Sequence, residues 1–139
     1  MERKISEIVD GGGIAICVFD TDVSQRDEVQ RRLLDHLKRK YGQKKNVIFC
    51  DSFPSVEYWF LLHYRNTNRY FGSSAEVERE LRTYIERYEK RTYFLEKEKW
   101  VADMCSGNKL GTAIQLAKDF GGYGESYSNI YKAIELFRS

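Results

Sequence analysis

The stretch "IAICVFDTDV", residues 14–23, contains the best strand candidate of the chain. It begins with a short, continuous apolar run, 14–19, that follows three glycines and ends at an aspartate pair. Such a run is typical of a strand buried on both faces of a sheet. A second run of the same kind, "NVIFC" at 46–50, predicts a second short strand.

The segment between these runs predicts a helix that extends from Val23 to about Tyr41. Its apolar residues follow helical spacing, charged residues occupy the other side, and Gly42 ends the pattern. A strand, a helix and a second strand in this order normally give two parallel neighbours in one sheet. The sequence therefore predicts an α/β fold with a mainly parallel sheet.

The rest of the chain predicts helices. One covers residues 2–9, and another covers 52–64 with Pro54 in its first turn, where proline is tolerated. Ser73 and Glu76 have the spacing of a capping box at the start of a helix that continues to about residue 88. We expect further helices near 96–105, 108–119 and 127–137, and a single domain over 1–139 with a predominantly helical C-terminal half.

The composition excludes several classes of protein. The chain has 139 residues, one proline and a net charge of only +2, so it is neither a disordered chain nor a polycation that wraps duplex DNA by charge alone. Its three cysteines are scattered and predict neither a disulfide framework nor a zinc site. No apolar run has the length of a signal peptide core or a membrane span, so we expect a cytoplasmic protein without a membrane partner.

Any nucleic-acid surface must therefore be local. The first candidate is "KRKYGQKK", residues 38–45, which includes Lys44 and Lys45. Its simpler interpretation is a solvated helix end, where cations favour the negative end of the helix dipole. The second candidate is "HYRNTNRYFG", residues 63–72, in which Arg65 and Arg69 alternate with aromatic residues.

Asp20 and Asp22 are the strongest candidates for a metal site. Side chains alternate along an extended segment, so both carboxylates can point the same way from the carboxyl end of a strand, where α/β sheets bind ligands. Mg²⁺ or Mn²⁺ would relieve their repulsion and leave positions open for phosphate oxygens. The alternative is that Asp22 caps a helix, with Gln25 three residues later. Asp20, at the tip of the strand, has no such cap to make.

Glu57 and His63 stand out on the helix predicted over 52–64. Glu57 lies on an apolar stripe, where a carboxylate is costly unless it is paired, hydrogen-bonded or bound to a metal. An arginine, the hydroxyl of a buried tyrosine and an active-site role all remain open as explanations. A histidine beside aromatic residues is more often a hydrogen-bonded structural residue than a ligand, so His63 is at most an accessory site residue.

Four stretches together resemble the RloB-like proteins, which are encoded near bacterial restriction and phage-defence systems and are related to Toprim domains. These are "CVFDTD", "SFPSVEYWFLLHY", "AIQLAKDF" and "SYSNIYKAIELF", and the likeness extends from about residue 14 to the end. The second is the most specific, because the family reads close to S-N-P-x-F-E-x-W-x-L-L-H-F there. Phe53 and Val56 depart from that pattern, and the matching residues are Ser52, Pro54, Glu57, Trp59, Leu61, Leu62 and His63.

The resemblance implies metal-dependent phosphoryl chemistry. Asp20 and Asp22 would hold the cation, and Glu57 would add a further catalytic carboxylate. Family members also carry a glutamate in an N-terminal E-G-x-T-E motif, which this chain does not contain: its acids before the strand, Glu2, Glu7 and Asp10, do not stand in that motif.

The resemblance thus implies an N-terminally shortened member of the family. Its sheet edge would be exposed, which predicts a homo-oligomer or a partner chain. Two functions follow from the sequence. One is a Mg²⁺-dependent nuclease whose active site is incomplete or is completed by a partner. The other is a non-catalytic nucleic-acid or protein interaction module of a defence system.

Overall fold

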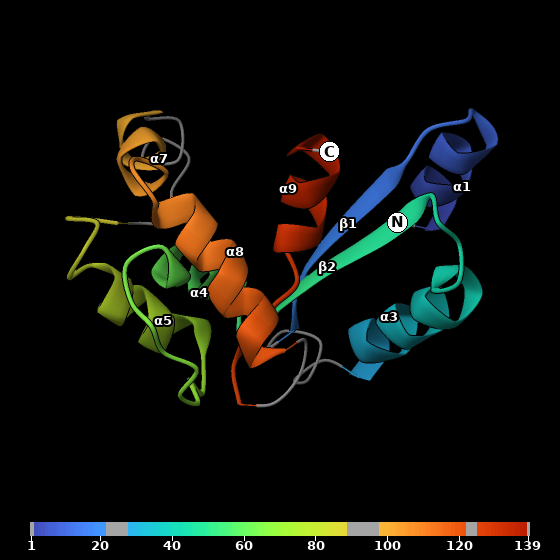
Figure 1. Ribbon diagram of the computed structural model, residues 1–139. Coiled ribbons are helices and arrows are strands. Elements are labelled where there is room, and N and C mark those ends of the chain that lie inside the picture. The colour runs from blue at the N-terminus through green and yellow to red at the C-terminus, as the bar shows by residue number, and fades with distance from the viewer. Residues whose placement is uncertain (1, 22–27, 89–97, 122–124, 139) are drawn as a thin grey trace.

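The protein is described by a computed structural model that covers residues 2–21, 28–88, 98–121 and 125–138. Figure 1 shows two long strands in the middle, with helices on both sides. The helices and strands are α1 (Glu2–Asp10), β1 (Ala15–Asp20), α3 (Glu28–Tyr41), β2 (Val47–Phe53), α4 (Val56–Leu62), α5 (Ser74–Leu81), α7 (Glu98–Met104), α8 (Lys109–Phe120), β3 (Tyr127–Ser128) and α9 (Tyr131–Arg138).

The sheet of the described residues has three strands in the order β1-β2-β3. β1 and β2 are parallel, as the strand–helix–strand order predicts, and Ala15 is aligned with Val47 and Asp20 with Ser52. β3 joins the far edge of β2 in the antiparallel direction, through Ser128 opposite Ser52. The α/β prediction is confirmed, but the sheet is mixed rather than purely parallel.

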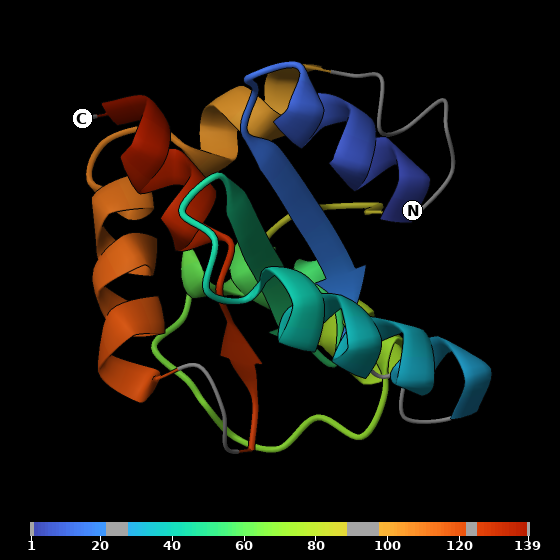
Figure 2. The same ribbon diagram turned by 90° about the vertical axis from the view of Figure 1, so that its right-hand side faces the viewer.

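Two apolar cores lie along the sheet. The first is on the face of β1 that carries Ala15 and Cys17, where α1 and α3 pack through Ile5 and Leu37. Figure 2 views this side, with α3 lying in front of the strands. α9 contacts β2 and lies on the other side of the sheet in Figure 1.

The second and larger core lies beyond the carboxyl ends of β1 and β2. α4 is at its centre and contacts both α5 and α8. Five residues of α4 carry side chains that are almost completely enclosed: Glu57, Tyr58, Trp59, Leu61 and Leu62. The helix is therefore enclosed on almost every side, and the core that it organises lies beside the strand ends where the candidate acids are found.

The helix predicted over 52–64 is shorter than expected. β2 continues to Phe53, because Ser52 and Phe53 pair with β3, and the Phe53–Pro54 peptide bond is cis. Ser55 is then the N-cap and α4 begins at Val56. Pro54 therefore precedes the helix instead of occupying its first turn. The helix predicted over 127–137 likewise begins later, at Tyr131, since residues 127 and 128 form β3.

The capping box is confirmed in one of its two hydrogen bonds. The Ser73 hydroxyl accepts from the amide of Glu76 at 3.4 Å. The Glu76 carboxylate accepts from the amide of Gly72 at 2.6 Å, one residue earlier than the usual partner. The helix α5 ends at Leu81, earlier than the spacing predicts, although Ile85 and Tyr88 still point into the core.

Within the described part of the chain, no helix has both the length and the apolar character that crossing a membrane requires.

Leu37 tests the first core, and Leu33 on the same helix is its control. Leu37 is 0% exposed and Leu33 is 42% exposed. We expect Leu37→Ala to lower the free energy of unfolding by about 2–5 kcal/mol, because it leaves a cavity against the sheet. Leu33→Ala should cost about 1 kcal/mol or less. Urea denaturation measures the free energy of unfolding of both variants. Equal decreases would contradict the packing of α3 against the sheet through Leu37.

Candidate acidic site at the strand ends

Asp20 lies at the carboxyl end of β1, directly beside the start of α4. Its Oδ1 accepts a hydrogen bond from the amide of Val56 at 2.9 Å. The N-cap residue Ser55 makes no side-chain cap of its own, so Asp20 supplies this acceptor from another part of the fold. The expectation that Asp20 has no cap to make is therefore wrong. The sequence did not indicate this cap, because the helix whose first amide it binds begins 36 residues later.

Asp22 lies outside the described residues, as does Gln25, its predicted partner in a helix cap. Both roles predicted for Asp22, the helix cap and the metal ligand, stay predictions. Thr21, the last described residue before this gap, is buried, and its hydroxyl donates to the carbonyl of Ser52 at 3.0 Å. This hydrogen bond fixes the end of β1 on β2 just before Asp22.

Glu57 is the second residue of α4 and is completely buried. The hydroxyl of Tyr88 donates to its Oε1 at 3.2 Å, so of the two structural partners predicted for Glu57, an arginine and a tyrosine, the structure shows a tyrosine. Tyr88 itself is 1% exposed and packs in the core edge to face against Phe60 and Trp100. A carboxylate and its hydroxyl partner are thus enclosed together in an apolar environment, where an unmet hydrogen bond is costly.

The charges of Glu57 and Asp20 both act on Tyr88. Burial raises the pKa of the Tyr88 hydroxyl strongly, the Glu57 carboxylate raises it further, and Asp20 adds to the shift. The hydroxyl therefore stays protonated and donates. The sequence analysis predicts that Asp20 and Glu57 contribute to one site. In the structure both carboxylates raise the pKa of the same group, the Tyr88 hydroxyl.

Asp51 is a buried acid that the sequence analysis did not select. Its carboxylate accepts from Asn129 at 2.9 Å and pairs with Lys38 at 3.2 Å. It is aligned with Phe19, whereas Asp20 is aligned with Ser52, so Asp51 and Asp20 point to opposite faces of the sheet. Asp51 could have been selected from the sequence by its position directly after the "NVIFC" run, which matches the position of Asp20 after the first apolar run.

His63 follows α4 as its C-cap and is only 4% exposed. Its Nδ1 lies 2.9 Å from the carbonyl of Trp59, and the two rings meet edge to face at 4.9 Å. Because a carbonyl only accepts, Nδ1 carries the proton and donates. His63 is therefore held as a hydrogen-bonded residue of the core, and no described acid lies in hydrogen-bonding contact with it.

The four cations predicted to bind nucleic acid do not form one surface. Arg65 and Arg69 both pair with the carboxylate of Glu80 on α5. Lys44 and Lys45 lie in the turn before β2, at the amino end of the parallel strands, whereas Asp20 lies at their carboxyl end. The alternative interpretation of the stretch 38–45 fits its first part, because residues 38–40 are the basic last turn of α3.

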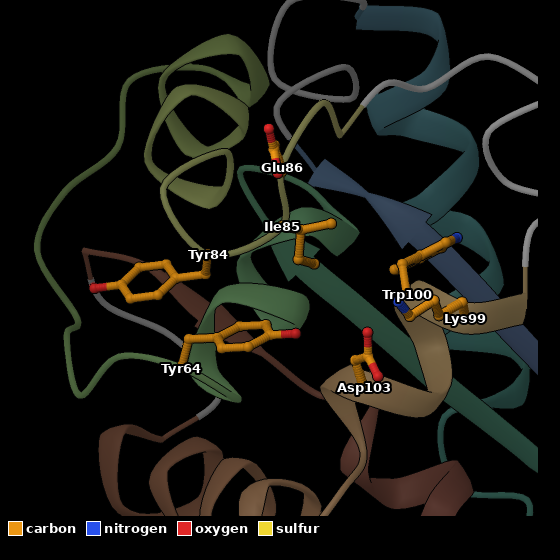
Figure 3. Close-up of a pocket in the computed structure, with 7 residues that line it drawn as sticks. All are labelled: Tyr64, Tyr84, Ile85, Glu86, Lys99, Trp100 and Asp103. Carbon is orange, nitrogen blue, oxygen red and sulfur yellow. The ribbon is translucent and has the colours of Figure 1, made fainter.

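Two pockets flank Tyr64, the residue that follows His63. The aromatic pocket, about 370 Å³, contains the stacked rings of Tyr64 and Tyr84, whose centres are 5.3 Å apart. Figure 3 shows these rings side by side and the Tyr64 hydroxyl directed towards Asp103. The polar pocket, about 380 Å³, is lined by Leu62, His63, Tyr64, Arg65, Asn66, Asn108, Lys109, Thr112 and Leu116.

Within the described residues, no three histidine, cysteine or acidic side chains are grouped closely enough to hold a metal ion. Of the candidate acids in the described residues, Asp20 is the carboxylate at the strand end, whereas Glu57 is completely buried and bonded to Tyr88. Magnesium commonly uses only one or two protein carboxylates, and water and phosphate oxygens complete its shell. The fold is therefore that of an α/β protein whose candidate acidic site lies at the carboxyl edge of its parallel strands.

Comparison with known protein families matches residues 10–136 to the family described as RloB-like protein. The match covers most of the chain, so this protein belongs to the RloB-like family, and the resemblance drawn from the four sequence stretches is confirmed. No curated protein and no solved structure matches it significantly.

The pair formed by Glu57 and Tyr88 can be tested with two tyrosine variants. We expect Tyr88→Phe to lower the free energy of unfolding by about 1–3 kcal/mol, because it deletes the donor to a buried carboxylate. Tyr84→Phe is the matched control, since Tyr84 is 39% exposed and no described residue bonds its hydroxyl. It should change stability by about 0.5 kcal/mol or less. Equal effects in urea denaturation would show that the bond to Glu57 contributes nothing.

His63 should make stability depend on pH. Burial lowers its pKa from the usual 6.5. The folded protein then binds this proton more weakly than the unfolded chain, so acid favours unfolding. The stability contributed by neutral His63 is fully present above pH 6.5 and falls as the pH drops through 6.5 towards the folded pKa.

His63→Asn isolates this effect, because an asparagine amide can still donate to Trp59 and does not titrate. Denaturation midpoints measured from about pH 8 to about pH 5 should fall more steeply for the wild type than for the variant. Parallel curves would contradict the proposed burial of a neutral histidine.

Proposed function

We propose that this RloB-like protein is a Toprim-related domain that acts on nucleic-acid phosphodiesters with Mg²⁺ or Mn²⁺ in bacterial phage defence. The proposal rests on one observation: Asp20, at the carboxyl end of a parallel strand, is bonded to the first residue of the helix that carries Glu57. Ligands of open α/β sheets bind at that edge. Asp22, two residues after Asp20, would be the second metal ligand.

The roles of the carboxylates differ. Asp20 has one oxygen bonded to a backbone amide, a contact that orients a carboxylate for a metal. Glu57 is enclosed and bonded to Tyr88, so it would position the site rather than touch the substrate. When bound, the cation would supply charge stabilisation for a phosphodiester and lower the pKa of a bound water.

Asp20→Asn is a sharp test of the metal site. The amide oxygen of asparagine can still accept from Val56, so the variant keeps the helix cap and loses the charge. We expect Mg²⁺ and Mn²⁺ to raise the melting temperature of the wild type, with about 2.7 kcal/mol of stabilisation at a hundredfold excess over Kd. Asp20→Asn should abolish the rise. Asp35→Asn, which changes an exposed acid on α3, should retain it.

A nuclease assay on DNA and RNA then separates catalysis from binding. Metal-dependent cleavage that Asp20→Asn removes would support the enzyme. Cleavage that persists in Asp20→Asn would exclude the assigned site. An unchanged melting temperature at millimolar metal would also contradict the proposal.

The second candidate is a non-catalytic interaction module, and one observation favours it. Asp20 already has a structural partner in the Val56 amide, which accounts for a carboxylate at this position without any metal. In that case metal shifts the melting temperature of neither the wild type nor Asp20→Asn, and neither protein cleaves nucleic acid. The same two measurements therefore decide between the two candidates.

A further inference from the structure

The polar pocket has the charge of an anion site. It lies at the start of α8, a helix of 12 residues without an acid in its first turn, and the side chain of Asn108 does not cap that turn. The first amides of a helix lack partners within the helix, and its dipole places positive charge there. In α8 the first of these amides, that of Lys109, donates to the carbonyl of Ser106 at 3.3 Å, so the amides of Leu110 and Gly111 are the ones left for a ligand. A helix start of this kind is common, and two further observations indicate that this one binds a ligand.

The first observation is the cation at the pocket. The Lys109 ammonium donates to the backbone carbonyl of Asp103 at 3.0 Å and lies 4.9 Å from the centre of the Tyr64 ring. No described carboxylate pairs with it, whereas Arg65 in the same lining is already bonded to Glu80. The lining of the polar pocket contains no acid. The aromatic pocket on the other side of Tyr64 carries acids, Glu86 and Asp103, so it fits an anion poorly (Figure 3).

The second observation is an unmatched acceptor. His63 lines the polar pocket and is 96% enclosed, since only 4% of its surface is exposed. Its Nδ1 donates to Trp59, which leaves Nε2 with a lone pair, and no described residue donates to this buried atom. Buried acceptors almost always have a donor. Burial and the charge of Lys109 both lower the pKa of His63, which keeps Nε2 an acceptor.

We propose that the polar pocket binds a phosphate group accompanied by an O–H donor, either free phosphate or the phosphate of a ribonucleotide. Lys109 and the first turn of α8 hold the anionic oxygens, and the Nε2 of His63 accepts the O–H. Asn66, Asn108 and Thr112 supply further polar groups in the lining. In free phosphate the O–H belongs to the anion itself, and in a ribonucleotide a ribose hydroxyl supplies it.

Phosphate and sulfate form a matched pair of probes. At about pH 8 both are tetrahedral dianions, but phosphate keeps one proton and sulfate keeps none. A neutral acceptor in the site discriminates between them, because sulfate leaves Nε2 unpaired and brings a lone pair towards it. We expect phosphate to bind about tenfold more tightly than sulfate, or better.

The experiment is an NMR titration of the full chain at constant ionic strength without divalent metal. The readout is the backbone amide signals of residues 109–112. His63→Asn should remove the preference for phosphate over sulfate, because its amide still donates to Trp59 while the shorter side chain leaves no acceptor at the position of Nε2. Lys109→Gln should weaken both anions by about tenfold. Lys118→Gln is its control, since Lys118 also lies on α8 near a tyrosine ring, that of Tyr131. It should have no effect.

Three results would overturn the proposal: equal affinity for the two anions, no amide shift at about 50 mM of either, or a phosphate preference that survives in His63→Asn. Adenosine monophosphate distinguishes the source, because tighter binding than phosphate assigns the pocket to nucleotides and equal or weaker binding assigns it to free phosphate. Asp20→Asn should bind phosphate as the wild type does. The phosphate pocket and the metal site can therefore be confirmed or contradicted independently of each other.

Discussion

The hydrogen bond from the Val56 amide to Asp20 joins the two cores of this protein. On one side of it is the small core between α1, α3 and the sheet, and on the other is the larger helical core organised by α4. The bond is 2.9 Å long and connects the last residue of β1 with the first residue of α4. Since Ser55 makes no side-chain cap, the start of α4 takes this partner from the strand. The position of Glu57 follows, because it is the next residue of the helix.

The burial of Glu57 is the second constraint. A carboxylate with no exposed surface requires hydrogen-bond donors around it, and Tyr88 provides one from beyond the end of α5. That contact draws the segment after α5 onto α4 and helps to define the larger core. Asp20 lies near enough to affect the same tyrosine hydroxyl. The hydroxyl of Tyr88 thus bonds one of these carboxylates and is influenced by the other, near the carboxyl edge of the sheet.

The local patterns predicted the elements that depend on local sequence. β1, α3 and the buried side chains of α4 follow from apolar runs and helical spacing, and the structure contains all three. The patterns failed where a distant pairing decides the outcome. β3 has two residues, and it exists because Ser128 and Tyr127 meet β2. The same pairing extends β2 to Phe53 and moves Pro54 out of the helix that its sequence position suggested.

The sequence by itself determined that an acid would stand at the tip of a buried strand, that Glu57 would lie on an apolar stripe, and that the chain belongs to the RloB-like family. Only the tertiary structure decided the partner of each polar atom. Asp20 meets an amide 36 residues away, Glu57 a tyrosine 31 residues away, and Asp51 an asparagine 78 residues away. The physical reason is that burial follows from the local spacing of apolar residues, whereas a hydrogen-bond partner is fixed by how distant segments pack.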